Sequence, residues 1–148
     1  MSRRFPPSVV SRQSPAAEVA GQVRIIGGQW RNTRLAVPNR PGLRPSSDRV
    51  RETLFNWLMP VLPGARVLDL FAGSGALGLE ALSRGADSAT LIEKDAALAG
   101  AIGQVASRLQ ARAQVITGDA LAWLSAPAAH AYDLVFVDPP FADGLWDQ

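Results

Sequence analysis

The sequence predicts an α/β fold, a parallel sheet with flanking helices, from three observations. From Arg66 onward, apolar runs of strand length alternate with helix-length segments, a glycine-rich turn follows the first run, and an acid ends or follows each run. Strands that alternate with helices form βαβ units, and such sheets bind ligands at the carboxyl ends of their strands. We therefore expect a functional site where those ends meet.

The chain is expected to have three parts. Residues 1–21 are rich in Pro, Ser and Ala with scattered Arg and predict a disordered basic tail. Residues 22–45 predict a small β-hairpin, with strands at 23–27 and 34–37, followed by a proline-broken loop. Residues 46–148 form the main domain.

The main domain is expected to open with a helix that leads into the sheet. Its cap is one of three polar residues: Ser46, Ser47 or Asp48. One apolar face is expected from Val50, Leu54, Phe55, Trp57 and Leu58. The strands that follow are expected at 66–70, 89–92, 114–117 and 132–137. The helices between them are expected at about 75–83, 95–110 and 119–124.

Composition narrows the class of protein. The chain has 148 residues, 47% of them hydrophobic and 19% charged, which is typical of one soluble globular domain. No apolar run approaches the roughly 20 residues of a membrane span, and the first 22 residues lack a secretory apolar block, so a cytoplasmic location is expected. Without Cys, and with His130 as the single His in a loop-like stretch, we expect no metal site and a surface histidine.

Charge is distributed unevenly between the two ends of the chain. Residues 1–51 hold ten Arg against two acids, a net +8, and residues 52–148 hold five basic residues against eleven acids, a net −6, which together give the total of +2. A basic front end on an acidic body is typical of a protein that binds a polyanion, since the planar Arg fork matches phosphate. The alternative is a solubilising tail that binds nothing.

The segment 132–141 is the most informative for chemistry, because an apolar strand leads directly into Asp138, Pro139, Pro140 and Phe141. The two prolines fix φ and carry no N–H, so nearby carbonyls are rigid and free to accept hydrogen bonds. Asp138 adds an acceptor, and Phe141 offers a flat face for stacking an aromatic base. This arrangement predicts chemistry on a planar amine; the alternative is a strand followed by a proline turn.

A second motif predicts a nucleotide-like cofactor. Gly73, Gly75 and Gly78 satisfy G-x-G-x-x-G between a strand and a helix, and Glu93 lies 20 residues beyond Gly73, where it can bind a ribose diol. A dinucleotide and an adenosine-bearing cofactor fit this motif equally well.

Asp69 separates these two cofactors. A charge within the first strand is costly without a partner, and a pyrophosphate would repel it, whereas the ammonium and sulfonium of S-adenosylmethionine would be attracted. Asp119, after the third strand, is placed to accept from an adenine amino group. The alternative for Asp69, Glu93 and Asp119 is that they are helix caps or surface acids.

These motifs resemble those of the bacterial 16S ribosomal RNA guanine-N2 methyltransferases. The resemblance covers about residues 23–141 and rests on four segments: 24–28 (RIIGG) with Trp30 and Arg31, 44–55 (RPSSDRVRETLF), 69–75 (DLFAGSG) and 138–141 (DPPF). It implies the Rossmann-like fold of class I S-adenosylmethionine-dependent methyltransferases with an N-terminal β-hairpin. Asn32 and Ser46 depart mildly from the family pattern, where Gly and Thr are expected.

The resemblance also implies roles for individual residues. The residues expected to bind S-adenosylmethionine are Asp69, Phe71, Ala72, Gly73, Ser74, Gly75, Glu93, Lys94, Asp119 and Ala120. The residues expected at the target base are Asp138, Pro139, Pro140 and Phe141. The residues expected to contact RNA are Arg24, Trp30, Arg31, Arg34, Arg44, Arg49 and Arg51. The expected partner is 16S rRNA in the small subunit or its assembly intermediate, and a monomer is expected.

The family pattern continues past the proline motif through further strands, whereas this sequence stops at Gln148. We therefore expect a C-terminally truncated sheet in which the strand at 132–137 is an open edge. The motif alone does not choose guanine N2 over adenine N6 or cytosine N4, so a DNA adenine methyltransferase is the near alternative. An inactive nucleic-acid-binding remnant is another, and an NAD-dependent oxidoreductase is disfavoured by Asp69.

Overall fold

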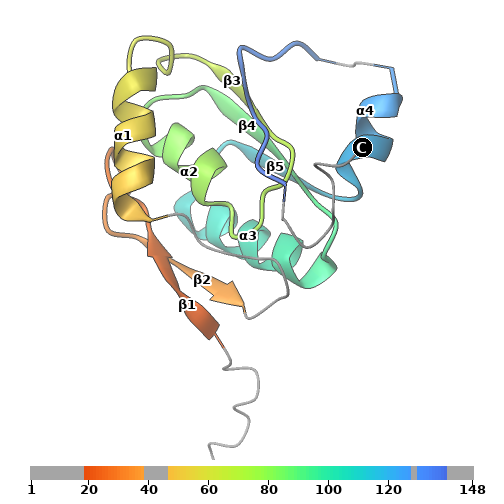
Figure 1. Cartoon of the computed structure of the whole chain (residues 1–148), viewed down its shortest axis with the longest axis horizontal. Helices are drawn as coiled ribbons and strands as arrows, with labels where there is room; N and C mark the ends of the chain where they lie inside the picture. The colour runs from red at the N-terminus through yellow and green to blue at the C-terminus, as the bar shows by residue number, and fades with distance from the viewer. Residues whose placement is uncertain (1–18, 39–46, 128–129, 140–148) are drawn as a thin grey trace, which may run out of the picture.

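The computed structural model describes residues 19–38, 47–127 and 130–139 (Figure 1). Within these ranges, four parallel strands form the main sheet in the order β5-β4-β3-β6. The elements in chain order are β1 Val19–Arg24, β2 Arg34–Pro38, α1 Asp48–Leu58, β3 Arg66–Asp69, α2 Ala76–Ser83, β4 Ser88–Glu93, α3 Ala96–Leu109, β5 Ala113–Thr117, α4 Ala120–Ser125 and β6 Leu134–Phe136. The predicted parallel α/β sheet and N-terminal hairpin are confirmed.

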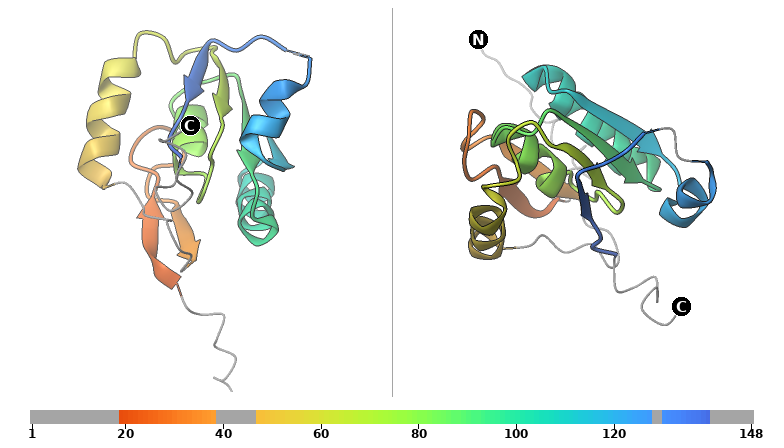
Figure 2. Two further views of the ribbon diagram at one scale, coloured as in Figure 1. Left: turned by 45° about the vertical axis from the view of Figure 1, so that its right-hand side comes forward. Right: turned by 90° about the horizontal axis from the view of Figure 1, so that it is seen from above.

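Side chains of successive strand residues alternate between two hydrophobic layers, as the period of two in a β-strand requires. Val67 and Leu91 belong to the larger layer, which α1, α2 and α3 help to build. Leu68 and Ile92 belong to the smaller layer beneath α4. Figure 2 shows α2 and α3 on one side of the sheet and α4 on the other. The strands are thus buried on both faces, which explains their nearly continuous apolar sequences.

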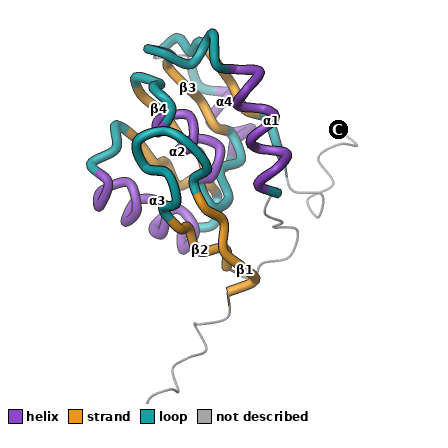
Figure 3. Tube along the Cα trace, turned by 90° about the vertical axis from the view of Figure 1, so that its left-hand side faces the viewer, coloured by secondary structure: helices purple, strands orange, loops and turns teal. Residues whose placement is uncertain are grey.

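The hairpin of β1 and β2 is antiparallel and lies at the end of the domain near α2 (Figure 3). Its turn contains Gly28 at φ +82°, where a Cβ atom would lie 1.9 Å from the carbonyl oxygen of Ser83. Only glycine combines that backbone conformation with so close an approach. The turn is therefore seated directly on the last residue of α2.

Several boundaries differ from those predicted. β1 starts at Val19, so the predicted tail loses its last three residues to the hairpin, and β1 ends at Arg24, before the expected 27. The α1 cap is Ser47, whose side chain accepts from the Val50 N–H at 3.1 Å. Only part of the apolar face predicted for α1 is covered: Phe55 is buried and Leu54 and Leu58 pack against the core, but Val50 and Trp57 are 60% and 77% exposed.

In the described part of the chain, β6 is an edge strand, as the sequence predicted. Val135 and Val137 at this edge are about half exposed. None of the described helices is long and apolar enough to cross a membrane.

Candidate cofactor and base site

The carboxyl ends of the four parallel strands bring the predicted acids to one edge of the sheet. Asp69 is the last residue of β3 and pairs in register with Leu91 and Phe136 of its neighbours. Glu93 is the last residue of β4, and Asp119 and Asp138 each follow the next strand end by two residues. Acids that are 19 to 69 positions apart in the sequence therefore line one edge, as the βαβ pattern requires.

The glycine turn between β3 and α2 is held by Glu93. One carboxylate oxygen accepts from the Gly73 N–H at 2.8 Å and the other from the Asp95 N–H at 2.9 Å. Gly73 and Gly75 have φ of +58° and +84°, in the left-handed region that favours glycine. Glu93 thus fixes the turn, a role that its spacing from Gly73 did not predict, and it keeps free lone pairs for a further donor.

Asp69 is a buried acid whose carboxylate lacks a full set of hydrogen-bond donors. Asp69 is 1% exposed, one oxygen accepts from the Gly78 N–H at 3.3 Å, and the other makes no hydrogen bond to a described residue, although the Phe71 amide lies close enough to lower its pKa. Burial raises the pKa of Asp69 to about 7, the Gly78 and Phe71 amides oppose the shift, and the charges of Asp138 and Glu93 add to it. An ionised Asp69 therefore needs a cation that the described chain does not supply.

Asp119 caps a helix, which is the structural alternative expected for this acid from the sequence. It is the N-cap of α4 and accepts from the Ala122 N–H at 2.9 Å, while Ala120 behind it is buried. The same geometry recurs at Asp95, which caps α3. Asp119 is nevertheless exposed at the carboxyl edge of the sheet, so its predicted contact to adenine stays a prediction.

The other predicted cofactor residues surround the same turn. Ala72 and Gly75 are buried, Phe71 and Ser74 are half-buried, and Lys94 is exposed. Ala72 is tied to the neighbouring strand by a hydrogen bond from its N–H to the Ile92 carbonyl at 3.0 Å.

Asp138 and Pro139, the first half of the proline motif, lie beside the glycine turn between β3 and α2, which is called the cofactor turn below because the predicted cofactor residues surround it. Asp138 is exposed and Pro139 is buried, and Asp138 is close enough to Asp69 to raise its pKa. Phe136, just before the motif, packs its ring 5.7 Å from that of Phe55 of α1. Pro140 and Phe141 lie outside the described residues.

The predicted RNA-contacting residues divide into surface and interior groups. Arg24, Arg31, Arg34 and Arg49 are exposed and Trp30 is half-buried, whereas Arg44 lies outside the described residues. The prediction was wrong for Arg51, which is 1% exposed and forms ion pairs with Asp48 at 2.8 Å and Glu80 at 3.4 Å. A guanidinium enclosed by carboxylates is not available to phosphate. Burial lowers the pKa of Arg51, although both acids oppose this shift.

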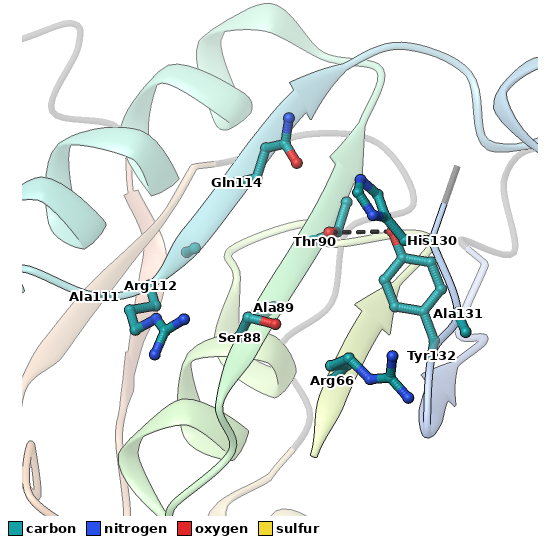
Figure 4. A pocket seen from close by; sticks show the side chains of 11 residues that line it. Arg66, Ser88, Ala89, Thr90, Ala111, Arg112, Gln114, His130, Ala131 and Tyr132 are labelled. Carbon is teal, nitrogen blue, oxygen red and sulfur yellow. Dashed lines mark hydrogen bonds between the residues drawn. The ribbon is translucent and has the colours of Figure 1, made fainter. Parts of the chain in front are cut away.

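A hollow of about 720 Å³ opens at the opposite, amino end of the sheet (Figure 4). Its lining includes Tyr132, which donates to the Thr90 hydroxyl at 3.3 Å, and the exposed His130. The two arginines of its rim are paired with acids, Arg66 with Asp133 at 3.1 Å and Arg112 with Asp87 at 3.0 Å. None of the predicted cofactor residues lines it, so we do not assign the cofactor to this hollow. Within the described ranges, no cluster of three metal-ligating side chains occurs.

Comparison with known proteins agrees with this geometry. Residues 23–148 match the model of the family described as conserved hypothetical protein 95. The chain belongs to this family. It is 53% identical over 137 residues to ribosomal RNA small subunit methyltransferase D of Escherichia coli (strain K12), which covers 92% of this chain and 69% of that protein. The corresponding Haemophilus influenzae protein is 46% identical over 140 residues, covering 92% and 72%.

Solved structures give the same relationship. The yhhF protein of E. coli superposes with a TM-score of 0.73 at 53% identity, covering 84% of this chain and 68% of that one. The T. thermophilus 16S rRNA N2 G1207 methyltransferase, in complex with AdoMet and guanosine, has a TM-score of 0.62 at 25% identity, covering 82% and 32%. The Rossmann-like methyltransferase fold and the family resemblance predicted from sequence are thereby confirmed.

One prominent structural feature, a buried acid in α2, was not predicted from the sequence. Glu80 of α2 is completely buried and accepts four hydrogen bonds, two of them from arginines. Its position inside a helical apolar pattern, A-L-G-L-E-A-L-S, was the available signal, because a lone acid in such a run needs partners from elsewhere.

Proposed function

We propose that this chain transfers a methyl group from S-adenosylmethionine to the exocyclic N2 amine of a guanine in small-subunit ribosomal RNA. The observation that carries the proposal is the unsatisfied carboxylate of Asp69 at the glycine turn of a conserved hypothetical protein 95 family member. The names of its relatives, ribosomal RNA small subunit methyltransferase D, supply the substrate class.

The residues at the carboxyl edge fit this cofactor better than a dinucleotide. Asp69 is buried beside two further acids, so an approaching pyrophosphate would meet repulsion. A cationic group is favoured there, because it would ionise Asp69 and satisfy its free oxygen. Glu93, with lone pairs left after its two backbone contacts, would bind the ribose hydroxyls. S-adenosylmethionine supplies the electrophilic methyl on a positively charged sulfur.

The chain's own contribution to the reaction is alignment. The guanine N2 is a weak nucleophile because its lone pair is delocalised into the ring. Asp138 and the Pro139 carbonyl would accept hydrogen bonds from its two N–H groups and thereby orient and localise that pair toward the methyl group. As the new N–C bond forms and the S–C bond breaks, S-adenosylhomocysteine would leave and N2 would release one proton to solvent. Phe141 would stack the base, which must be unpaired or flipped to enter the site. No covalent protein intermediate is required.

The exposed arginines of the hairpin and α1 would bind the RNA backbone. Arg24, Arg31, Arg34 and Arg49 lie on the surface of the front end, where cations bind phosphates and release condensed counterions. A ribosomal RNA substrate supports the further proposal of a cytoplasmic enzyme whose partner is the small subunit or its assembly intermediate.

The test is transfer of labelled methyl from S-adenosylmethionine to small-subunit rRNA, followed by nucleoside analysis of the digested product. Subunits from cells without this modification serve as substrate, the E. coli relative as positive control and Asp138→Ala as negative control. Labelled N2-methylguanosine is the expected product. Label in N6-methyladenosine would replace the proposed substrate base, and no label with active E. coli enzyme would refute the proposed activity.

A further inference from the structure

Glu80 connects the hairpin to the body of the protein through the backbone. Its two carboxylate oxygens accept from the Ile26 and Gly27 N–H groups, each at 2.9 Å. These two amides belong to the segment that joins β1 to the hairpin turn. A bidentate contact to successive backbone amides fixes the direction of a segment more tightly than packing alone.

Two arginines neutralise the buried charge of Glu80. Arg84 donates from Nε at 2.7 Å and Arg51 from Nη1 at 3.4 Å, and the three side chains are between 0% and 10% exposed. A buried carboxylate with four donors is fully compensated, whereas removal of its charge would leave both arginines short of an acceptor. Asp48 accepts from Arg51 at 2.8 Å and gives the cluster its second negative charge.

The cluster continues to the surface at a predicted RNA contact. The other oxygen of Asp48 accepts from Nε of Arg24 at 2.9 Å, and Arg24 also donates to the side-chain oxygen of Asn32 at 3.1 Å. A continuous series of contacts therefore runs from Glu80 through Arg51 and Asp48 to Arg24.

Ser83 attaches the same hairpin at a second point. Its hydroxyl donates to the Gly27 carbonyl at 2.6 Å and accepts from the Trp30 N–H at 2.9 Å, and its own carbonyl accepts from the Gln29 N–H at 2.9 Å. The Cβ position of Gly28 is blocked by this same carbonyl. The hairpin is therefore attached to α2 at two points that lie about one helical turn apart, Glu80 and Ser83.

The opposite end of α2 is part of the cofactor turn. α2 begins after Gly75, and the Gly78 N–H donates to Asp69. The helix has eight residues, so about 12 Å separate its ends. Arg84 also lies over the Phe55 ring, 5.4 Å from its centroid, and Phe55 contacts Phe136 just before the base motif.

We infer that Glu80, supported by Ser83, is a positioning residue that sets the direction of the basic hairpin relative to the cofactor turn, and so governs the binding of RNA. The inference rests on the proposed function, because it assigns the hairpin to RNA. Glu80 touches neither RNA nor cofactor; it acts through Arg24 and through the backbone of the hairpin turn.

The test compares Glu80→Gln with Glu52→Gln, the same chemical change on the exposed face of α1. RNA affinity is measured by fluorescence anisotropy with a small-subunit rRNA fragment, S-adenosylmethionine affinity by calorimetry, and methyl transfer by KM and kcat. Glu80→Gln should bind RNA about tenfold more weakly and raise the KM for RNA, as expected for groups in one hydrogen-bonded network. Cofactor affinity and kcat at saturating RNA should match the wild type, and Glu52→Gln should match it throughout.

A double-mutant cycle with Arg24→Ala separates positioning from general stability. If Glu80 acts through Arg24, the double variant loses less RNA affinity than the sum of the single variants. Additive losses, or a parallel fall in RNA and cofactor affinity, would overturn the inference. If Glu80→Gln does not fold, Ser83→Ala provides the second test, and unchanged RNA affinity in that variant would also overturn it.

The proposed function fails separately. A wild-type chain that binds RNA but transfers no methyl group refutes the methyltransferase assignment. In that case the double-mutant cycle, measured by fluorescence anisotropy, still reports the coupling between Glu80 and Arg24 in RNA binding. Methyl transfer by the wild type with a wild-type KM in Glu80→Gln refutes only the positioning role.

Discussion

Substitution of Asp69 by Asn should stabilise the protein without cofactor, although it removes a site residue. The Asp69 carboxyl is buried, one of its oxygens has no partner among the described residues, and burial raises its pKa from 3.8 to about 7. At neutral pH and above, folding therefore has to bury a poorly compensated negative charge. Asn has the same shape and carries no charge, so that cost disappears.

The magnitude follows from the shift in pKa. Between about pH 4 and pH 7 the folded state holds a proton that the unfolded state has released, so the stability of the wild type falls as the pH rises through this window. A pKa raised from 3.8 to about 7 corresponds to a loss of about 4 kcal/mol in the free energy of unfolding above pH 7. The variant lacks this loss, so its advantage over the wild type should grow by roughly 3 kcal/mol between about pH 5 and pH 8.

Urea denaturation at these two pH values, followed by tryptophan fluorescence, measures the difference. Asp87→Asn is the matched control, because Asp87 is an exposed acid whose carboxylate pairs with Arg112. The control should show no comparable growth in stability with pH. An Asp69→Asn variant whose advantage is the same at both pH values would refute the reasoning that Asp69 is a buried, unsatisfied acid.

Three further outcomes are expected. Asp138→Ala should lower methyl transfer at least about 100-fold while S-adenosylmethionine binding, measured by calorimetry, is unchanged; normal turnover would remove Asp138 from the base site. Gly28→Ala should destabilise the fold by about 3 kcal/mol in urea, because its Cβ would meet the Ser83 carbonyl at a φ of +82°. The control Gly100→Ala, on the open side of α3, should be neutral or stabilise by up to about 1 kcal/mol, and equal effects at both glycines would contradict the docking of the hairpin turn. Arg31→Ala should weaken RNA binding and lower the slope of log affinity against log salt by about 1; an unchanged slope would place RNA elsewhere.

The alternation of strands and helices could be predicted because each element carries its own local signal. Strand-length apolar runs that alternate with helix-length segments predicted the parallel sheet, and the structure adds that Val67 and Leu91 face one hydrophobic layer while Leu68 and Ile92 face the other. The order of acids along the sequence then placed Asp69, Glu93, Asp119 and Asp138 at one edge without knowledge of any contact.

Long-range pairing could not be predicted in the same way. Glu80 meets Arg51 across 29 positions and Ile26 across 54, and no local rule selects these partners. Arg51 therefore looked like a surface arginine within a basic segment. The exposure of Trp57 could not be predicted for a related reason: helical periodicity shows which residues share a face, but not how far the neighbouring elements extend over it.

Some predicted residues have a second, structural role that hides in the sequence. Glu93 holds the Gly73 amide and Asp119 caps α4, and both contacts use the acceptor oxygens that the cofactor prediction also uses. A carboxylate has about four lone-pair sites, so the two roles are compatible. Sequence spacing reports the position of such an acid, whereas only the structure reports what already binds it.

Calorimetric titration of the 148-residue chain with S-adenosylmethionine, with NAD as the competing ligand class, tests the central claim most directly. The account predicts saturable binding of S-adenosylmethionine, with affinity that rises as the pH rises through about 7 because Asp69 ionises, and with no such rise in Asp69→Asn. NAD should give no heat of binding. Binding of NAD in preference to S-adenosylmethionine, or an affinity for S-adenosylmethionine that Asp69→Asn leaves unchanged at every pH, would contradict it.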